Sequence, residues 1–162
     1  MAKHRLNLFN LEGNLFTHDI EKALPFDSHF DLVYSFGVLH HTPDIKTAIR
    51  NIYNVLKPGG EFKCMLYAKN SLKYFQIKEG LDQYEAKSGV PIANVYTNEE
   101  IYDLFSDFEN INIKQTHIFP YKIEPYKRHE YILEDHYKNM PHELFKVMEN
   151  NLGWHLCIKS YK

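Results

Sequence analysis

The chain has 162 residues, of which 44% are hydrophobic, 25% charged and 15% aromatic. This composition supplies the side chains of a buried core and excludes a disordered segment. Nineteen basic residues stand against 21 acidic ones, so the net charge is −2 with histidine neutral, and a dedicated binder of nucleic acid or anionic membrane is not expected.

The first half of the chain predicts a strand–helix–strand unit. Residues 14–19 are predicted to form a strand after a glycine turn, and residues 30–35 have the dense apolar content of a strand covered on both faces. Apolar side chains then recur at helical spacing over 45–56, and a Pro-Gly-Gly turn leads into a further strand over 61–67. This order is the βαβ unit of a parallel sheet.

The second half predicts one helix and two strands that close the sheet. Thr97 and Glu100 form a capping-box pattern ahead of a helix. Residues 111–118 and 154–159 alternate apolar and polar side chains, which is typical of strands. Because a long excursion with a short helix near 143–150 separates these two strands, we expect an antiparallel edge.

We expect a single domain over residues 1–162, because no repeat, linker or low-complexity tract interrupts the chain. The segments 69–93 and 120–150 are predicted to be insertions or lid segments. Within the second segment, a basic and aromatic cluster could stack nucleic-acid bases, but the net charge favours tyrosines that pack on the sheet edge. The cluster consists of Tyr121, Tyr126, Lys127, Arg128, His129 and Tyr131.

The two cysteines and the first residues bear on the location of the protein. Cys64 and Cys157 each lie in an apolar run, so we interpret them as buried core residues in a reducing compartment. Residues 1–5 lack the apolar core of a signal peptide, and no apolar stretch has the length of a membrane span. These features predict a soluble, cytoplasmic protein.

Three motifs in order carry a resemblance to a known family. They are residues 19–26 (DIEKALPF), 30–44 (FDLVYSFGVLHHTPD) and 55–60 (VLKPGG). Together they closely resemble the class I S-adenosylmethionine-dependent methyltransferases, and most of all the type 11-like group that acts on small molecules. The resemblance implies an α/β, Rossmann-like methyltransferase fold, S-adenosylmethionine as the cofactor and a small molecule as the methyl acceptor.

The resemblance also implies which residues contact the cofactor. An acidic residue after a strand, here Asp19, can accept a hydrogen bond from the amine of adenine, and the next residue, Ile20, lies against the ring. Ser35, Phe36 and Gly37 are implied near the methionine part, with Leu39 packing on adenine. Two alternatives remain open: Asp19 can be a turn or cap residue, and Gly37 can serve a tight turn alone.

Further residues are candidates for catalysis and acceptor binding. His40 and His41 are the catalytic candidates, as a general base or in acceptor contact, and the competing interpretation is that they are packed or capping histidines. A metal at this pair is not expected, because suitable ligands are lacking at local spacing. Tyr67, Asn70 and Tyr74 follow the third strand and are the substrate candidates.

The sequence departs from the family in one large respect. It has seven glycines and no Gly-x-Gly, whereas the family cradles the methionine moiety with a Gly-rich turn. Aligned by its motifs, the chain is expected to begin inside the family's second helix, with residues 3–9 as the end of that helix. We therefore expect an N-terminally truncated domain whose strand over 31–35 has an unpaired apolar edge. A homo-oligomer, through this edge or by exchange of the N-terminal segment, is the predicted assembly.

Two functions follow from this departure. The first is methyl transfer to a small-molecule acceptor. The second is a non-catalytic fragment or subunit of the methyltransferase fold that acts as a binding module. Whether the chain alone is an enzyme stays open at the level of sequence.

Overall fold

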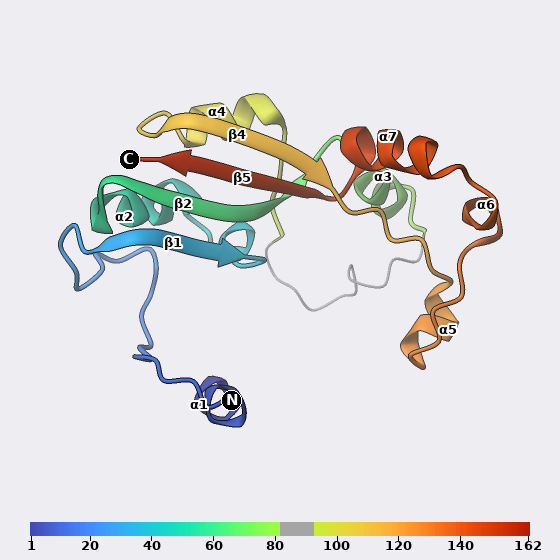
Figure 1. Cartoon of the computed structure of the whole chain (residues 1–162). Helices are drawn as coiled ribbons and strands as arrows, with labels where there is room; N and C mark the ends of the chain where they lie inside the picture. The colour runs from blue at the N-terminus through green and yellow to red at the C-terminus, as the bar shows by residue number, and fades with distance from the viewer. Residues whose placement is uncertain (82–92) are drawn as a thin grey trace.

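The structure is a computed structural model that describes residues 1–81 and 93–162 (Figure 1). Its strands are β1 (Phe30–Phe36), β2 (Leu56–Ala68), β3 (Val95–Tyr96), β4 (Glu109–Thr116) and β5 (His155–Tyr161). Its helices are α1 (Ala2–Leu8), α2 (Ile45–Val55), α3 (Leu72–Lys78), α4 (Asn98–Leu104), α5 (Ile123–Lys127), α6 (Asp135–Lys138) and α7 (His142–Leu152), with a 3-10 turn, η1, over Leu39–His41. Among the described helices, none has the length and apolar character needed to cross a membrane.

The described strands form one mixed sheet. Its order is β1-β2-β5-β4, and the short β3 pairs with the end of β2. β1 and β2 are parallel, while β5 is antiparallel to both β2 and β4. The βαβ unit of the first half and the antiparallel edge of the second half are therefore confirmed.

The core lies between the sheet and two helices on one face (Figure 1). α2 begins at Asp44, whose carboxylate accepts a hydrogen bond from the Thr47 N–H, and it buries one apolar stripe. α4 begins with the predicted capping box between Thr97 and Glu100. Phe105, directly after α4, stacks on Phe62 of β2 with ring centroids 5.5 Å apart. The buried residues that share this core include Leu39, Ala48, Ile49, Ile52, Leu56, Phe62, Leu66, Ile101, Phe105 and Leu156.

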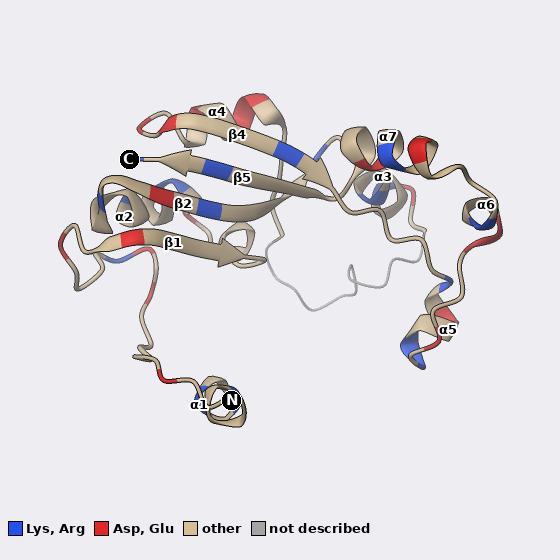
Figure 2. Ribbon diagram, viewed as in Figure 1, with Lys and Arg blue, Asp and Glu red and all other residues tan. Residues whose placement is uncertain are grey.

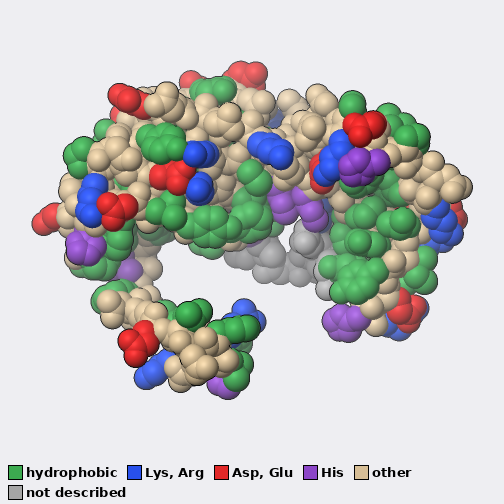
Figure 3. All heavy atoms as spheres, viewed as in Figure 1, with side chains coloured by type: hydrophobic (Ala, Val, Ile, Leu, Met, Phe, Trp, Pro, Cys, Tyr) green, Lys and Arg blue, Asp and Glu red, His purple; other side chains and the backbone are tan. Residues whose placement is uncertain are grey.

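The opposite face of the sheet carries no helix in the part of the chain that the structure describes (Figure 1). Over β2 and β5 this face is charged, with Glu61 2.9 Å from both Lys63 and Lys159 (Figure 2). These two ammonium groups lower the pKa of Glu61 to about 2. Over β1 the same face is apolar and exposed, as the hydrophobic side chains along the lower margin of the sheet show (Figure 3).

The predicted strand over residues 14–19 is wrong. This segment is irregular and exposed, and it follows α1, which itself buries none of its residues. Its two large apolar side chains, Leu15 and Phe16, are adjacent, so a strand would point them to opposite faces. The structure shows one ring contact there, between Phe16 and Phe26 at 5.6 Å. That contact ties the segment to the loop before β1 instead of to the strand itself.

The two predicted insertions are described to different extents. α3 forms the first part of the 69–93 segment, of which residues 82–92 lie outside the described residues. The 120–150 segment holds α5, α6 and most of α7. Its tyrosines contact one another, with Tyr121 and Tyr126 stacked at 5.8 Å, and Arg128 pairs with Glu130 at 3.1 Å. The basic and aromatic cluster therefore packs on itself, with partnered charges, instead of on the sheet edge.

Candidate cofactor cavity

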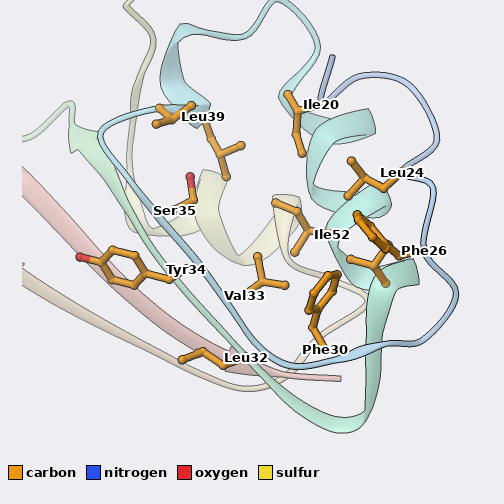
Figure 4. A pocket seen from close by; sticks show the side chains of 12 residues that line it. Ile20, Leu24, Phe26, Phe30, Leu32, Val33, Tyr34, Ser35, Leu39 and Ile52 are labelled. Atoms are coloured by element: carbon orange, nitrogen blue, oxygen red, sulfur yellow. The ribbon is translucent and has the colours of Figure 1, made fainter. Parts of the chain in front are cut away.

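An apolar cavity of about 400 Å³ lies between β1, α2 and the loop that precedes β1 (Figure 4). Its volume falls in the range of small-molecule sites, near the lower end. The residues that line it are Ile20, Leu24, Phe26, Phe30, Leu32, Val33, Tyr34, Ser35, Val38, Leu39, Ile52 and Val55. Most of them come from the three motifs that carried the family resemblance.

The cavity brings together three of the six residues predicted to contact the cofactor. Ile20 comes from the loop before β1, Ser35 from β1 and Leu39 from η1, and Figure 4 shows them around one end of the cavity. These positions are 15 and 4 residues apart along the chain, so the fold is what makes them neighbours. The sequence motifs thus converge on one site.

The loop that carries Ile20 is held in place by α2. The side-chain amide of Asn51 donates hydrogen bonds to the carbonyl oxygens of Ile20 and Lys22, at 2.9 and 3.0 Å. The carboxylate of Glu21 accepts a further bond from the Asp44 N–H at 3.0 Å. Asn51 is almost fully buried, so these bonds are shielded from water. They position Ile20 over the cavity.

The cavity reaches around the free edge of β1. Four consecutive residues line it, Leu32, Val33, Tyr34 and Ser35. Successive side chains of a strand point to opposite faces of the sheet, so one cavity can touch all four only where the strand has no neighbour. Among the described residues, β1 pairs with β2 alone. The edge strand is therefore itself a wall of the site.

The chemistry of the lining suits a planar, weakly polar group. Its polar side-chain atoms are the hydroxyls of Ser35 and Tyr34, and none of the lining residues is charged. A purine base buries two apolar faces and needs few hydrogen-bond partners at its rim, which such a slot supplies. The cationic and carboxylate ends of an amino acid find no counter-charge among the lining residues.

Three other predicted cofactor residues lie outside this lining. Asp19 is exposed at a turn, where its carboxylate accepts from the Glu21 N–H at 3.1 Å, in agreement with the alternative turn interpretation. Phe36 projects to the uncovered face and stacks on Tyr34 at 6.2 Å. Gly37 has φ +73°, a backbone conformation that favours glycine, so its turn needs this residue.

The two candidate catalytic histidines have different surroundings. His40 is fully buried, with its ring centroid 3.7 Å from that of Tyr67 and 4.2 Å from that of His41. Burial, and next the neighbouring His41, lower the pKa of His40 to about 4. The hydroxyl of Thr42 donates to the Leu39 carbonyl at 2.7 Å and closes the turn that presents both rings. At neutral pH His40 is therefore an uncharged, packed imidazole.

The substrate candidates do not gather at one point. Tyr67 stacks on Trp154 at 4.3 Å and faces His155 across the β2–β5 ladder. The Asn70 carbonyl accepts from the Gln115 side chain at 2.8 Å, which ties the end of β2 to β4. Tyr74 lies on α3, with the Lys78 ammonium 5.7 Å from its ring centre.

Sequence reasoning missed the aromatic group next to Tyr67. His155 stacks on His117 at 4.3 Å, and its ring lies 5.7 Å from that of Phe36. The alternation over 154–159 placed His155 on the face opposite Trp154, but nothing local indicated that Tyr67 is its cross-strand partner. Within the described residues, no three histidine, cysteine or acidic side chains are grouped so that they could hold a metal ion.

Comparison with known proteins agrees with the motifs and the fold. The family model described as "Methyltransferase domain" matches residues 1–64. A methyltransferase from Thermotoga maritima superposes with a TM-score of 0.58 at 22% identity, over 90% of this chain and 62% of its own. The YcgJ protein of Bacillus subtilis superposes with a TM-score of 0.61 at 18% identity, over 99% of this chain and 74% of its own. The predicted resemblance to the class I S-adenosylmethionine-dependent methyltransferases is confirmed. Its Rossmann-like fold class is thereby confirmed.

Among named relatives, the ubiquinone/menaquinone biosynthesis C-methyltransferases of two Rickettsia species are similar to this chain. The protein of Rickettsia felis is 42% identical over 78 residues, 46% of this chain and 31% of the relative. That of Rickettsia akari is 37% identical over 106 residues, 63% of this chain and 42% of the relative. The chain thus spans less than half the length of these relatives. S-adenosylmethionine is the cofactor of the methyltransferase family that this chain resembles.

Proposed function

We propose that this methyltransferase chain binds the adenine base of S-adenosylmethionine in the β1–α2 cavity and takes part in methyl transfer to a small-molecule acceptor. The observation that carries the proposal is the convergence of Ile20, Ser35 and Leu39 on one apolar slot. Their elements lie at the end of β1 and in the loops around it, where open α/β sheets place their ligands. The cytoplasm is the proposed location.

Each group of residues has a distinct part in this proposal. The cofactor supplies a methyl group on a sulfonium, already activated for displacement by a nucleophile of the acceptor. Ile20 and Leu39 cover the faces of the base, and the Ser35 hydroxyl offers a hydrogen bond at its rim. Asp19 lies one residue before this slot and remains the proposed partner of the exocyclic amine. Catalysis rests chiefly on holding donor and acceptor in line.

His40 and His41 are the proposed catalytic residues. The low pKa of His40 keeps its imidazole neutral, so it can accept a hydrogen bond from the acceptor, although it is a weaker base than an ordinary histidine. Because His40 is buried, it acts on an acceptor only after the η1 turn moves, whereas His41 is half-buried beside it. Tyr67 adjoins this pair, and Asn70 and Tyr74 complete the proposed acceptor side.

The relatives support a small-molecule acceptor. Two of them are named as C-methyltransferases of ubiquinone and menaquinone biosynthesis. A third, phosphoethanolamine N-methyltransferase 2 of Caenorhabditis elegans, is 28% identical over 94 residues. The stacked rings of Tyr67, Trp154 and His155 favour a planar acceptor over a flexible chain.

A second candidate is a non-catalytic binding module of the same fold. The observation in its favour is the absence of any charged side chain from the cavity lining, which leaves the amino-acid end of the cofactor unpartnered there. This candidate predicts either weak binding of the base alone or binding that requires another polypeptide. Methyl transfer is then absent in a screen of acceptors.

Calorimetric titration with S-adenosylhomocysteine, the product of the reaction, tests the proposal. We expect saturable binding at micromolar concentration by the unmodified chain. Ile20→Glu places a carboxylate in the apolar slot and should weaken binding at least tenfold, because an unpaired buried charge costs well over 1.4 kcal/mol. Ile132→Glu is the matched control, since Ile132 is exposed and outside the cavity lining.

The outcomes separate the two candidates. Binding that is lost in Ile20→Glu and kept in Ile132→Glu supports the site. Binding without transfer of a labelled methyl group to any acceptor in a panel of quinones, phenols and amines favours the binding module. Absence of heat at millimolar ligand overturns the cavity as a cofactor site.

A further inference from the structure

The ring of Tyr67 lies between two other rings at the end of β2. Its centroid is 3.7 Å from that of His40 on η1 and 4.3 Å from that of Trp154, the residue before β5. The planes are inclined by 32° and 22°, so both neighbours meet the flat side of the phenol ring. Two rings cannot both lie about 4 Å above the same face of a third ring without overlapping. His40 and Trp154 therefore cover opposite faces of Tyr67.

The two outer rings carry hydrogen-bonding atoms that Tyr67 does not use. The indole Nε1 of Trp154 and both ring nitrogens of His40 are buried and have no hydrogen-bond partner among the described residues. Trp154 is 5% exposed, and His40 is fully buried. The Met65 backbone also acts on the pKa of His40, but it lies outside hydrogen-bond geometry. Burial of a donor without a partner is unfavourable, so these atoms point to a ligand that supplies the partners.

The two sides of this slot are held differently. The Trp154 N–H donates to the His117 carbonyl, and the Trp154 carbonyl accepts from the Ala68 N–H, both at 2.8 Å. His40 belongs to the short η1 turn, whose movement the proposed function already requires. Tyr67 itself is half-buried, and the bonds that join β2 to β3 and β5 are made by backbone groups. Its side chain can therefore rotate out of the slot while the sheet stays intact.

We propose that the Tyr67 ring occupies the place of the acceptor ring. When η1 moves, a planar acceptor with an oxygen atom at its rim enters between His40 and Trp154 and displaces the phenol ring of Tyr67. The indole N–H of Trp154 then donates to that oxygen, and the neutral imidazole of His40 bonds a second rim atom. This inference rests on the proposed function for the role of the slot in methyl transfer, and it narrows the acceptor to an oxygenated planar ring.

The chemistry of the slot selects this class of ligand. Two aromatic sides favour a flat ring over a flexible aliphatic chain. A hydrocarbon ring fills the same space, but it leaves the nitrogens of Trp154 and His40 without partners, as Tyr67 does. A ring with hydroxyl or carbonyl groups supplies those partners. Selection by polar groups that otherwise stay unpaired is stronger than selection by shape alone.

Nuclear magnetic resonance of the indole N–H tests the proposal, because Trp154 is the single tryptophan of the chain. The probe is 4-hydroxyacetophenone, and ethylbenzene is the matched ring without oxygen. The unmodified chain should bind the probe with millimolar affinity and shift the indole proton downfield, because Tyr67 must first be displaced. Tyr67→Val removes the competing ring and keeps a side chain suited to a strand, so it should bind about tenfold more tightly. Tyr102→Val, at an exposed tyrosine on α4, should bind as the unmodified chain does.

Two results overturn the place-holding role of Tyr67. One is an unmodified chain that does not bind the probe up to its solubility limit, and the other is equal binding by the unmodified and Tyr67→Val chains. Ethylbenzene bound as tightly as the probe overturns the oxygenated class. Calorimetry of Trp154→Phe, which keeps a ring without the N–H, should show that the preference for the probe over ethylbenzene is reduced.

The unmodified chain keeps the test decisive if Tyr67→Val does not fold. Its indole signal must shift with 4-hydroxyacetophenone and not with ethylbenzene, and an equal response to both contradicts the proposal. None of these measurements contains S-adenosylhomocysteine. Failure of cofactor binding in the β1–α2 cavity therefore leaves their outcome unchanged, and it counts against the proposed function alone.

Discussion

The fold alters the titration of His40. Its ring is buried against Tyr67 and His41, and the pKa falls from an ordinary value near 6.5 to about 4. The unfolded chain therefore binds a proton at this site between pH 6.5 and 4 that the folded chain does not. By linkage, the free energy of unfolding rises with pH through this window, and the stability is lost as the pH falls from 6.5 toward 4.

The pH dependence of the unfolding free energy measures this effect. We expect up to about 3 kcal/mol of lost stability at pH 4 from His40 alone, and little further loss from it below that pH. His40→Phe removes the titrating group and should flatten the curve between pH 6.5 and 4. A slope that His40→Phe does not alter would contradict the assignment.

At the scale of elements, one helix residue holds the loop of the cofactor cavity. Asn51→Ala removes the two bonds to the Ile20 and Lys22 carbonyls. The expected loss is about 1–3 kcal/mol of unfolding free energy, because two partly buried acceptors lose their donor. Urea unfolding measures it, and Asn54→Ala, one turn further on the exposed side of α2, should change the value by less than about 0.5 kcal/mol. The same Asn51 variant should also weaken S-adenosylhomocysteine binding, since Ile20 is released.

The elements that sequence predicted correctly are those with local signals. The apolar stripe of the helix from Ile45 to Val55 and the capping box at Thr97 each depend on residues only three or four positions apart. Such patterns can be recognised in a single sequence. The strand predicted over 14–19 failed because a strand exists only with a ladder partner, and the local pattern does not state whether one is present. The prediction that the next strand, β1, has one unpaired edge was nonetheless confirmed among the described residues. That prediction was based on which strands the chain is expected to contain, and not on the local pattern.

The candidate site was predictable to the extent that it lay in contiguous motifs. Ile20, Ser35 and Leu39 were identified from the family resemblance, and the structure brings them to one cavity. Other contacts join residues that are distant in the sequence. Asn51 and Ile20, which are hydrogen-bonded, are 31 positions apart, and the cross-strand partners Tyr67 and His155 are 88 positions apart. Nothing in a single sequence encodes such pairs, because they follow from the crossing of helix and loop and from the register of an antiparallel ladder.

At the scale of the whole molecule, helices cover one face of the sheet, and the other face has no helix over it among the described residues. α2 and α4 cover the face that holds the core, while the opposite face and the β1 edge are exposed (Figures 1 and 3). α1 and the segment after it extend away from this body and bury none of the helix's residues. The exposed apolar side chains of β1 therefore contribute less to stability than the buried side chains of the core.

We propose that copies of this chain associate, and in that case the stability of the folded chain depends on its own concentration. If two copies pair through β1, the folded dimer is favoured by mass action, and a tenfold dilution removes about 1.4 kcal/mol of that advantage. The 1.4 kcal/mol is shared by two chains, so we expect the melting temperature to fall by roughly 1–3 °C per tenfold dilution. Scanning calorimetry between 5 and 500 μM measures this shift.

Tyr34→Lys tests whether self-association uses the open edge of β1. A lysine in the middle of this exposed apolar strand disfavours pairing with another strand, so the variant should be monomeric, with a melting temperature that no longer depends on concentration. Tyr34 is already 64% exposed, so the monomer should tolerate lysine there. Tyr102→Lys makes the same substitution on α4 and should keep the dependence of the unmodified chain. A concentration dependence that survives in Tyr34→Lys would place the association elsewhere on the molecule, and the open edge of β1 would then be a feature of the isolated chain alone.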